Sequence, residues 1–217
     1  MEERLNTMTT QPLPAPDPSS RLAPRMGELR TILEGTEPAV LAERTGSELA
    51  GNEFRLHLWG KAVILTLPGF IALDAATRQE LRPDQQMLLL YYFGTADATP
   101  QTGKWISFAD LPGGRFYNQA FQGYSGKELA RAFQDDRAAF ERAAQALDGV
   151  RHALGDAAFA FQALPRVSLL AVFWQGDEEF PSTCQVLFDA AASHYLPTDA
   201  YAILGGTLTR RLIKARR

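Results

Sequence analysis

Hydrophobic and polar residues alternate between positions 54 and 59, which predicts a strand with one buried and one polar face. Phe54, Leu56 and Leu58 fall on the buried face. The run 61–67 is almost entirely apolar and β-branched at its centre, and a glycine separates it from the first run. The pattern therefore predicts an antiparallel β-hairpin.

Apolar residues at helical spacing predict several helices, bounded by capping residues, prolines and glycines. The block 87–93 is apolar on nearly all sides, so its helix should be central. Ser125 and Glu128 have the spacing of a capping box, and the Asp135–Asp136 pair marks a joint between helices. The predicted helices are 25–33, a second that Thr36 caps and that ends by Gly46, 83–93, one or two segments within 125–149, and 198–212 with Thr198 as cap.

Short apolar runs predict further strands at 105–108, 157–164 and 167–174, and the run 185–188 is a strand or the start of a helix. Since the run 167–174 is apolar at nearly every position, it should be a central strand with Trp174 mostly buried. Strands and helices come in mixed order, without the alternation of a doubly wound parallel sheet. The expected fold class is α+β, with a mixed, mostly antiparallel sheet packed with helices.

The first 24 residues are predicted to form a disordered Pro-rich tail. Proline occupies alternate positions from 12 to 18, which favours polyproline II and disfavours helix. Residues 25–217 are then expected to form a single globular domain.

Composition narrows the class of protein. The net charge of the 217 residues is −3, so a nucleic-acid partner is not expected. One cysteine, Cys184, excludes an internal disulfide and a multi-cysteine metal or iron–sulfur site. The chain lacks an apolar run of membrane-spanning length and a secretory signal pattern. We expect a soluble, cytoplasmic protein with no membrane partner and no bound metal.

Motifs with known chemistry are absent from the sequence. It contains neither a Gly-x-x-x-x-Gly-Lys-Ser/Thr loop nor a Gly-x-Gly-x-x-Gly fingerprint. His57 falls on the polar face of its strand. Cys184, Asp189 and His194 could form a nucleophilic group, but apolar neighbours favour a buried thiol at Cys184.

Two segments are the candidate ligand-binding elements. In the first, residues 103–114, a short strand runs into Leu-Pro-Gly-Gly, where backbone amides can meet a ligand. The candidate residues of this segment and of the aromatic stretch that follows it are Trp105, Ser107, Gly113, Gly114 and Tyr117.

The second segment is the acidic loop Asp177, Glu178 and Glu179, which follows the buried strand 167–174. Three carboxylates at a strand end can hold a cationic or hydroxyl-rich ligand or act as an acid or base. At least one of them should accept a hydrogen bond, and we expect its donor to come from the first segment. A solvated acidic turn is the competing interpretation.

Several motifs carry a resemblance to a known family. They are Gly-Lys-Trp-Ile-Ser-Phe-Ala-Asp-Leu-Pro-Gly-Gly at 103–114, Ala-Leu-Pro-Arg-Val at 163–167, Phe-Trp-Gln-Gly-Asp-Glu-Glu-Phe-Pro at 173–181, Val-Leu-Phe-Asp at 186–189 and Tyr-Leu-Pro at 195–197. Together they resemble the prokaryotic domain-of-unknown-function family number 3786, over roughly residues 53–212. Some members look like fusions to a cysteine-rich iron–sulfur module also found in corrinoid enzymes. The resemblance thus implies a redox or corrinoid protein partner. It implies no particular reaction, because the motifs of the family have no assigned chemistry.

Three hypotheses about function remain open. The first is a small-molecule or cofactor-binding module that uses the aromatic segment as a wall and the acidic loop as a clamp. The second is an enzyme in which Glu178 or Glu179 acts as acid or base, assisted by His194 or Tyr117. The third is a protein-interaction scaffold that docks through the Pro-rich tail and the basic end of the last helix. The sequence does not identify a cofactor.

Overall fold

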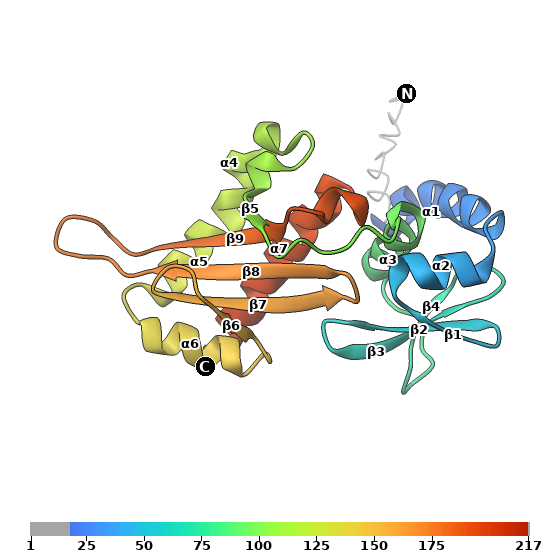
Figure 1. Ribbon diagram of the computed structural model, residues 1–217, viewed down its shortest axis with the longest axis horizontal. Helices are drawn as coiled ribbons and strands as arrows, with labels where there is room; N and C mark the ends of the chain where they lie inside the picture. Colours follow the sequence, from blue (N-terminus) through green and yellow to red (C-terminus); the bar gives the residue numbers. More distant parts are fainter. Residues whose placement is uncertain (1–17, 217) are drawn as a thin grey trace, which may run out of the picture.

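Two antiparallel β-sheets lie at opposite ends of the molecule in the computed structural model, which describes residues 18–216 (Figure 1). The predicted α+β class is confirmed, and every strand pair in both sheets is antiparallel. The sequence pattern indicated one sheet, because local alternation reports strands and not which strands share a sheet.

The first sheet has the strand order β1-β2-β3-β4. The predicted hairpin is confirmed as β2 and β3, whose last and first residues, Leu58 and Lys61, pair across a two-residue turn. Trp59 and Gly60 in this turn have φ angles of 54° and 77°, the left-handed pair that suits the twist of a hairpin. The strands are β1 (Glu48–Ala50), β2 (Glu53–Leu58), β3 (Lys61–Thr66) and β4 (Ala72–Asp74).

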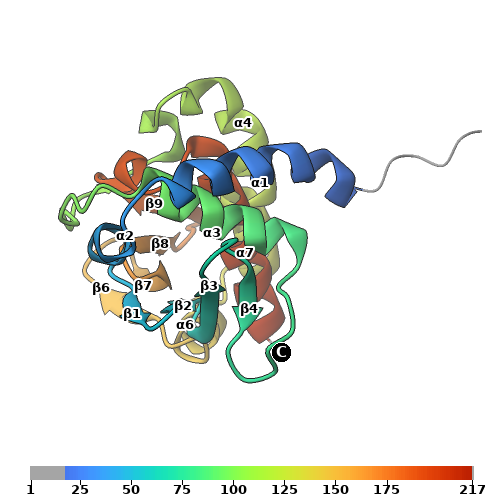
Figure 2. The same ribbon diagram turned by 90° about the vertical axis from the view of Figure 1, so that its right-hand side faces the viewer.

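Three helices accompany this sheet: α1 (Pro18–Glu34), α2 (Pro38–Thr45) and α3 (Pro83–Thr95). Figure 2 shows α1 lying alongside α3. Leu89, Leu90 and Tyr92 of α3 are fully buried, as expected for a central helix. The N-cap position of α2 is held by Glu37 and not by the predicted Thr36.

The beginning of α1 differs from the predicted tail. The helix starts at Pro18 and includes Pro24, so residues 18–24 are helical and the predicted boundary at residue 24 falls inside an element. A proline in the first helical turn loses no hydrogen bond, which lets Pro18 open a helix as readily as it would extend a tail. The remainder of the predicted tail, residues 1–17, lies outside the described residues.

The second sheet has the order β5-β9-β8-β7-β6. Its members are β5 (Trp105–Ile106), β6 (Val150–His152), β7 (Ala157–Leu164), β8 (Val167–Trp174) and β9 (Thr183–Asp189). The run 185–188 is therefore a strand and not a helix. The strand β8 is central as predicted, although Trp174 at its end is only half-buried. The edge strand β6 was missed because its three residues are all exposed.

The remaining helices are packed with the second sheet: α4 (Gly114–Tyr124), α5 (Gly126–Phe133), α6 (Arg137–Gln145) and α7 (Thr198–Ala215), with short 3-10 turns η1 (Phe108–Asp110) and η2 (Ala192–His194). Asp136 caps α6 by accepting a bond from the Ala139 amide, as the predicted joint requires. The predicted capping box at Ser125 does not form, because its buried hydroxyl donates to the Phe121 carbonyl instead.

One apolar core runs through both sheets. Phe54 of β2 and Phe173 of β8 are fully buried members of the same cluster. A hydrogen bond also joins the sheets, from the Trp59 amide to the Ala163 carbonyl of β7 at 2.9 Å. Within residues 18–216, no helix is long and apolar enough to cross a membrane.

Gly126 is expected to tolerate no side chain. A Cβ atom there would lie 2.3 Å from the Cys184 carbonyl oxygen, which is backbone and cannot turn away. Gly126→Ala should therefore lower the free energy of unfolding by about 2 kcal/mol in urea denaturation. Gly123→Ala is the matched control, since no atom lies within 4 Å of its Cβ position, and it should stabilise by about 0.5 kcal/mol. Equal effects of the two substitutions would contradict this packing.

Candidate ligand cleft between the two sheets

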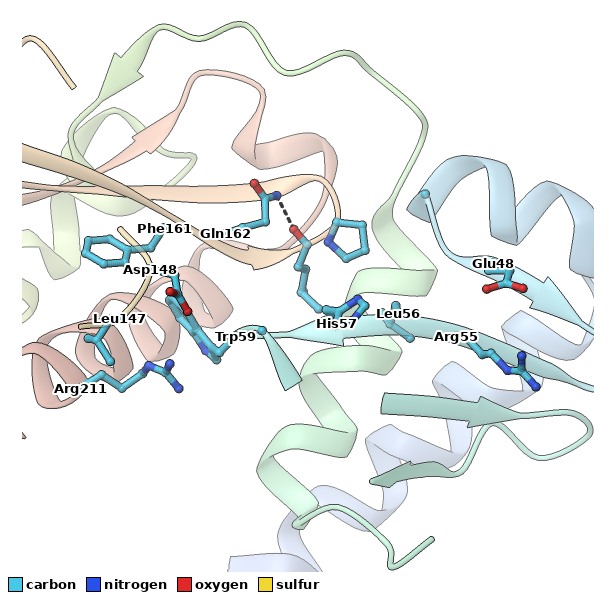
Figure 3. Close-up of a pocket in the computed structure, with 14 residues that line it drawn as sticks. Glu48, Arg55, Leu56, His57, Trp59, Leu147, Asp148, Phe161, Gln162 and Arg211 are labelled. Atoms are coloured by element: carbon cyan, nitrogen blue, oxygen red, sulfur yellow. Dashed lines mark hydrogen bonds between the residues drawn. The ribbon is translucent and has the colours of Figure 1, made fainter. Parts of the chain in front are cut away.

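A cleft opens where the β2–β3 turn meets the end of β7, beside the Trp59–Ala163 bond. Its volume is about 540 Å³, within the range of small-molecule sites. Figure 3 shows the side chains that line it, which come from both sheets, from the turn between α6 and β6, and from α7. Those with polar or aromatic groups are Glu48, Arg55, His57, Trp59, Asp148, Phe161, Gln162 and Arg211.

The polar groups are spread along the length of the cleft (Figure 3). Trp59, Asp148 and Arg211 gather at one end, and Glu48 and Arg55 lie at the other. The guanidinium of Arg211 lies 5.4 Å from the centre of the Trp59 ring, a cation–π contact. The cleft therefore offers an indole ring with a guanidinium packed against it at one end, and at the other a guanidinium that forms no salt bridge within residues 18–216.

The alternation of β2 explains why these groups face the cleft. Phe54, Leu56 and Leu58 turn into the core, so Arg55 and His57 must point outward. The sequence predicted this polar face, but the element opposite it could not be read from a local pattern. Arg211 was interpreted as part of a basic helix end, whereas it is half-buried against Trp59.

A second hollow of about 540 Å³ continues from the cleft along the outer face of β2 and β3. The two hollows share Arg55 and His57, which thus stand between them. At its far end Arg78 forms a 2.6 Å salt bridge with Glu53. This hydrogen-bonded guanidinium lowers the pKa of the Glu53 carboxyl.

The free groups of the cleft define what it can do. No salt bridge among the described residues engages Arg55 or His57. A guanidinium presents donors in a fork that fits carboxylate or phosphate, and an imidazole can donate or accept. Within the described part of the chain, no group of three or more His, Cys, Asp or Glu side chains could hold a metal ion.

The first predicted segment is built mainly for local structure. The Ser107 hydroxyl bonds Asp110 at 2.7 Å in a capping box of η1. Gly113 has a φ of 72°, and a Cβ at Gly114 would lie 1.9 Å from the Phe108 carbonyl oxygen, so these glycines permit the tight start of α4. Tyr117 is 61% exposed on α4 and lines a different hollow, between α4 and α7.

Trp105 lies on the edge strand β5 and reaches across the open face of the second sheet. Its indole N–H donates to Nε2 of His152 at 3.1 Å, although His152 belongs to the opposite edge strand, β6. In a flat sheet, the two edge strands β5 and β6 would lie four strand spacings apart, or about 19 Å. The hydrogen bond between their side chains therefore requires a strongly curled sheet. Beneath the indole lies a small apolar cluster that includes Leu170 and Val172.

The acidic loop does not meet the first segment. It connects β8 to β9 and therefore lies next to Thr183, the first residue of β9. Trp105 pairs with Asp189, the last residue of β9, which is about 20 Å away along the strand. Asp177 accepts bonds from the Phe180 and Glu179 amides of its own loop, which lower the pKa of its carboxyl. The expected donor from the first segment is therefore corrected to these amides.

The remaining carboxylates of that loop, Glu178 and Glu179, are exposed to solvent. The structure does not gather them with His194 or Tyr117, which belong to η2 and α4. Strand ends are visible in a sequence, but which two ends share an edge depends on strand order, and no local pattern encodes it.

Cys184, Asp189 and His194 are likewise not assembled. Cys184 and Asp189 point to opposite faces of β9 because their positions differ by an odd number. Burial raises the pKa of the Cys184 thiol to about 12, in agreement with the buried-thiol interpretation. His194 Nδ1 instead lies 2.7 Å from Asp97, which anchors the connection between α3 and β5.

The fold and the cleft define an α+β protein with a small-molecule-sized hollow between two antiparallel sheets. The family model described as Domain of unknown function (DUF3786) matches residues 37–211, from the edge of α2 to near the end of α7. The chain belongs to this family, as its motifs predicted. No curated protein and no solved structure matches the chain.

Cys184 should be nearly inert in the native protein. With a pKa of about 12, its thiolate fraction at pH 8 is roughly a thousandfold below that of a free cysteine. Labelling with Ellman's reagent should be slow in native buffer and immediate in denaturant. Native labelling within seconds at pH 8 would contradict the buried position of this thiol.

The Asp97–His194 pair should give a measurable acid dependence of stability. Hydrogen bonds from His194 and Thr99 lower the pKa of the Asp97 carboxyl to about 2. Because this pKa is lower in the folded than in the unfolded chain, the stabilisation is present above about pH 4 and is lost as the pH falls toward 2.

Denaturation of the native chain and of Asp97→Asn at several pH values tests this. The difference in unfolding free energy should shrink between about pH 4 and pH 2, and it should be modest because the pair is exposed. A difference that does not change over this range would contradict the assignment.

Proposed function

We propose that this protein is a small-molecule or cofactor-binding module whose ligand occupies the cleft between the two sheets. The observation that carries the proposal is one hollow of about 540 Å³ that holds the Trp59 indole at one end and Arg55 at the other, with His57 also in its lining (Figure 3). Pockets of this size at the junction of two structural units are typical ligand sites.

The lining favours a ligand with two distinct parts. A flat unsaturated ring can pack at the Trp59 end, where the indole and the apolar Leu147 and Phe161 supply contact area. A carboxylate or phosphate group can reach the guanidinium of Arg55 and the ring of His57. Flavin nucleotides and haem combine a flat ring system with phosphate or carboxylate groups, and corrinoids carry amide groups around a puckered ring.

Binding without catalysis is the simplest activity consistent with these residues. The acid/base hypothesis is less favoured, since Glu178 and Glu179 lie on a solvent-exposed loop and the assisting groups, His194 and Tyr117, belong to η2 and α4. A redox or corrinoid protein as partner rests on the family resemblance alone, and a cytoplasmic location on the sequence pattern.

A thermal-shift panel with FMN, haemin, hydroxocobalamin, Mg²⁺ and Zn²⁺ tests the proposal. A ligand that binds the folded state raises the melting temperature, by about 5 °C or more at a hundredfold excess over its dissociation constant. We expect at least one of the ring compounds to produce such a shift. The proposal would be contradicted if no compound of the panel raised the melting temperature.

Substitutions in the cleft test whether a ligand that raises the melting temperature binds there. Arg55→Ala and His57→Ala should reduce this rise, because both exposed side chains face the cleft and carry no core packing. Arg44→Ala on α2 is the matched control, an exposed arginine that does not line the cleft. A shift that survives both cleft substitutions would place the ligand elsewhere.

A further inference from the structure

An apolar patch is exposed on α4 and α7, two helices that contact each other. Figure 1 shows the positions of these helices. Phe116 is 97% exposed, Tyr117 61%, Ile203 52% and Tyr124 39%. A folded chain usually buries residues of this size, and a contiguous exposed group of them marks an interaction surface.

A groove of about 500 Å³ runs through this patch. Its buried members are Phe108 of η1 and the small residues Ala202 and Gly206 of α7, and its exposed members include Tyr117 and Ile203. A Cβ atom at Gly206 would lie 3.3 Å from the Tyr124 ring and 3.5 Å from the Arg210 guanidinium, so side chains of the same chain cover this glycine. The surface thus presents an exposed isoleucine beside the groove.

Opposite charges stand at the two ends of the groove. Asp199 and Arg210 both line it, and they are eleven residues apart on α7. Eleven residues make three helical turns and span about 16 Å, so both side chains lie on the same face of the helix. No salt bridge within residues 18–216 engages either of them.

The pattern along this face is complementary to itself when reversed. If two copies of α7 run antiparallel about a two-fold axis between positions 204 and 205, Asp199 of one copy faces Arg210 of the other. Ile203 lies about 2 Å along the helix from this axis, so the exposed isoleucines of the two copies meet near it. The charge match occurs twice, as a two-fold interface requires.

We propose that the α4–α7 face binds a second copy of this chain in a two-fold antiparallel dimer. The reversed charge pair argues for an identical partner, because a second copy supplies both opposite charges at the matching positions. Tyr117 of α4 also lines the groove and adds exposed apolar contact area. This inference is independent of the ligand cleft.

Sedimentation equilibrium of the full chain, with charge-reversal variants, tests the dimer. Asp199→Arg and Arg210→Asp each place like charges opposite one another and should weaken dimerisation by about tenfold or more. The double variant Asp199→Arg/Arg210→Asp restores opposite charges and should recover most of the native affinity. Ile203→Glu should abolish the dimer, whereas Ile32→Glu, an equally exposed isoleucine on α1, should leave it intact.

Circular dichroism and the melting temperature confirm that each variant is folded. A native chain that stays monomeric at millimolar concentration would overturn the proposal. So would a dimer that survives Ile203→Glu, because it must use another surface. The antiparallel pairing would be overturned if the double variant dimerised no more tightly than either single variant.

Discussion

One continuous apolar core fixes the two sheets against each other, and the cleft exists because of it. Buried side chains from β2, α3, β8 and α7 belong to the same cluster. Burying a single phenylalanine of this core contributes about 2 to 3 kcal/mol, so sliding one sheet past the other would cost many such contacts. The position of the cleft walls is therefore a consequence of packing on the far side of β2.

The β2–β3 hairpin contributes both to the apolar core and to the cleft. One face of β2 fills the core, the other carries Arg55 and His57, and the turn between the strands brings Trp59 to the end of β7. Trp59 has a left-handed backbone, which costs a bulky residue about 1 kcal/mol or more. Its amide gains the bond to Ala163 in return, and its ring becomes a wall of the cleft.

Features with a local periodicity could be predicted from the sequence. The alternation of β2, the apolar block of α3 and the helical spacing of α7 each indicated an element that the structure contains. The strand β6 has no apolar residue turned to the core and gave no signal. Ser125 had the spacing of a cap, yet the Phe121 carbonyl is a nearer partner for its hydroxyl.

The candidate site was harder to predict because it is assembled by long-range contacts. Arg55 and Arg211 are 156 positions apart in the chain, and only the packing of α7 near the hairpin turn brings both to one hollow. The two loops with the most distinctive sequences, at 103–114 and 177–179, instead lie at opposite ends of β9. Distinctive residues at strand ends mark turns as readily as binding sites, and strand order decides between them.

The indole N–H signals of the three tryptophans provide the most direct test of the cleft as a ligand site. In a ¹H–¹⁵N spectrum, assigned by Trp→Phe substitution, a probe that stabilises the protein should shift the Trp59 signal. Trp105 and Trp174 lie on the open face of the second sheet, outside the cleft, and their signals should stay in place. A bound probe that moves the Trp105 or Trp174 signal and leaves Trp59 unchanged would contradict the account.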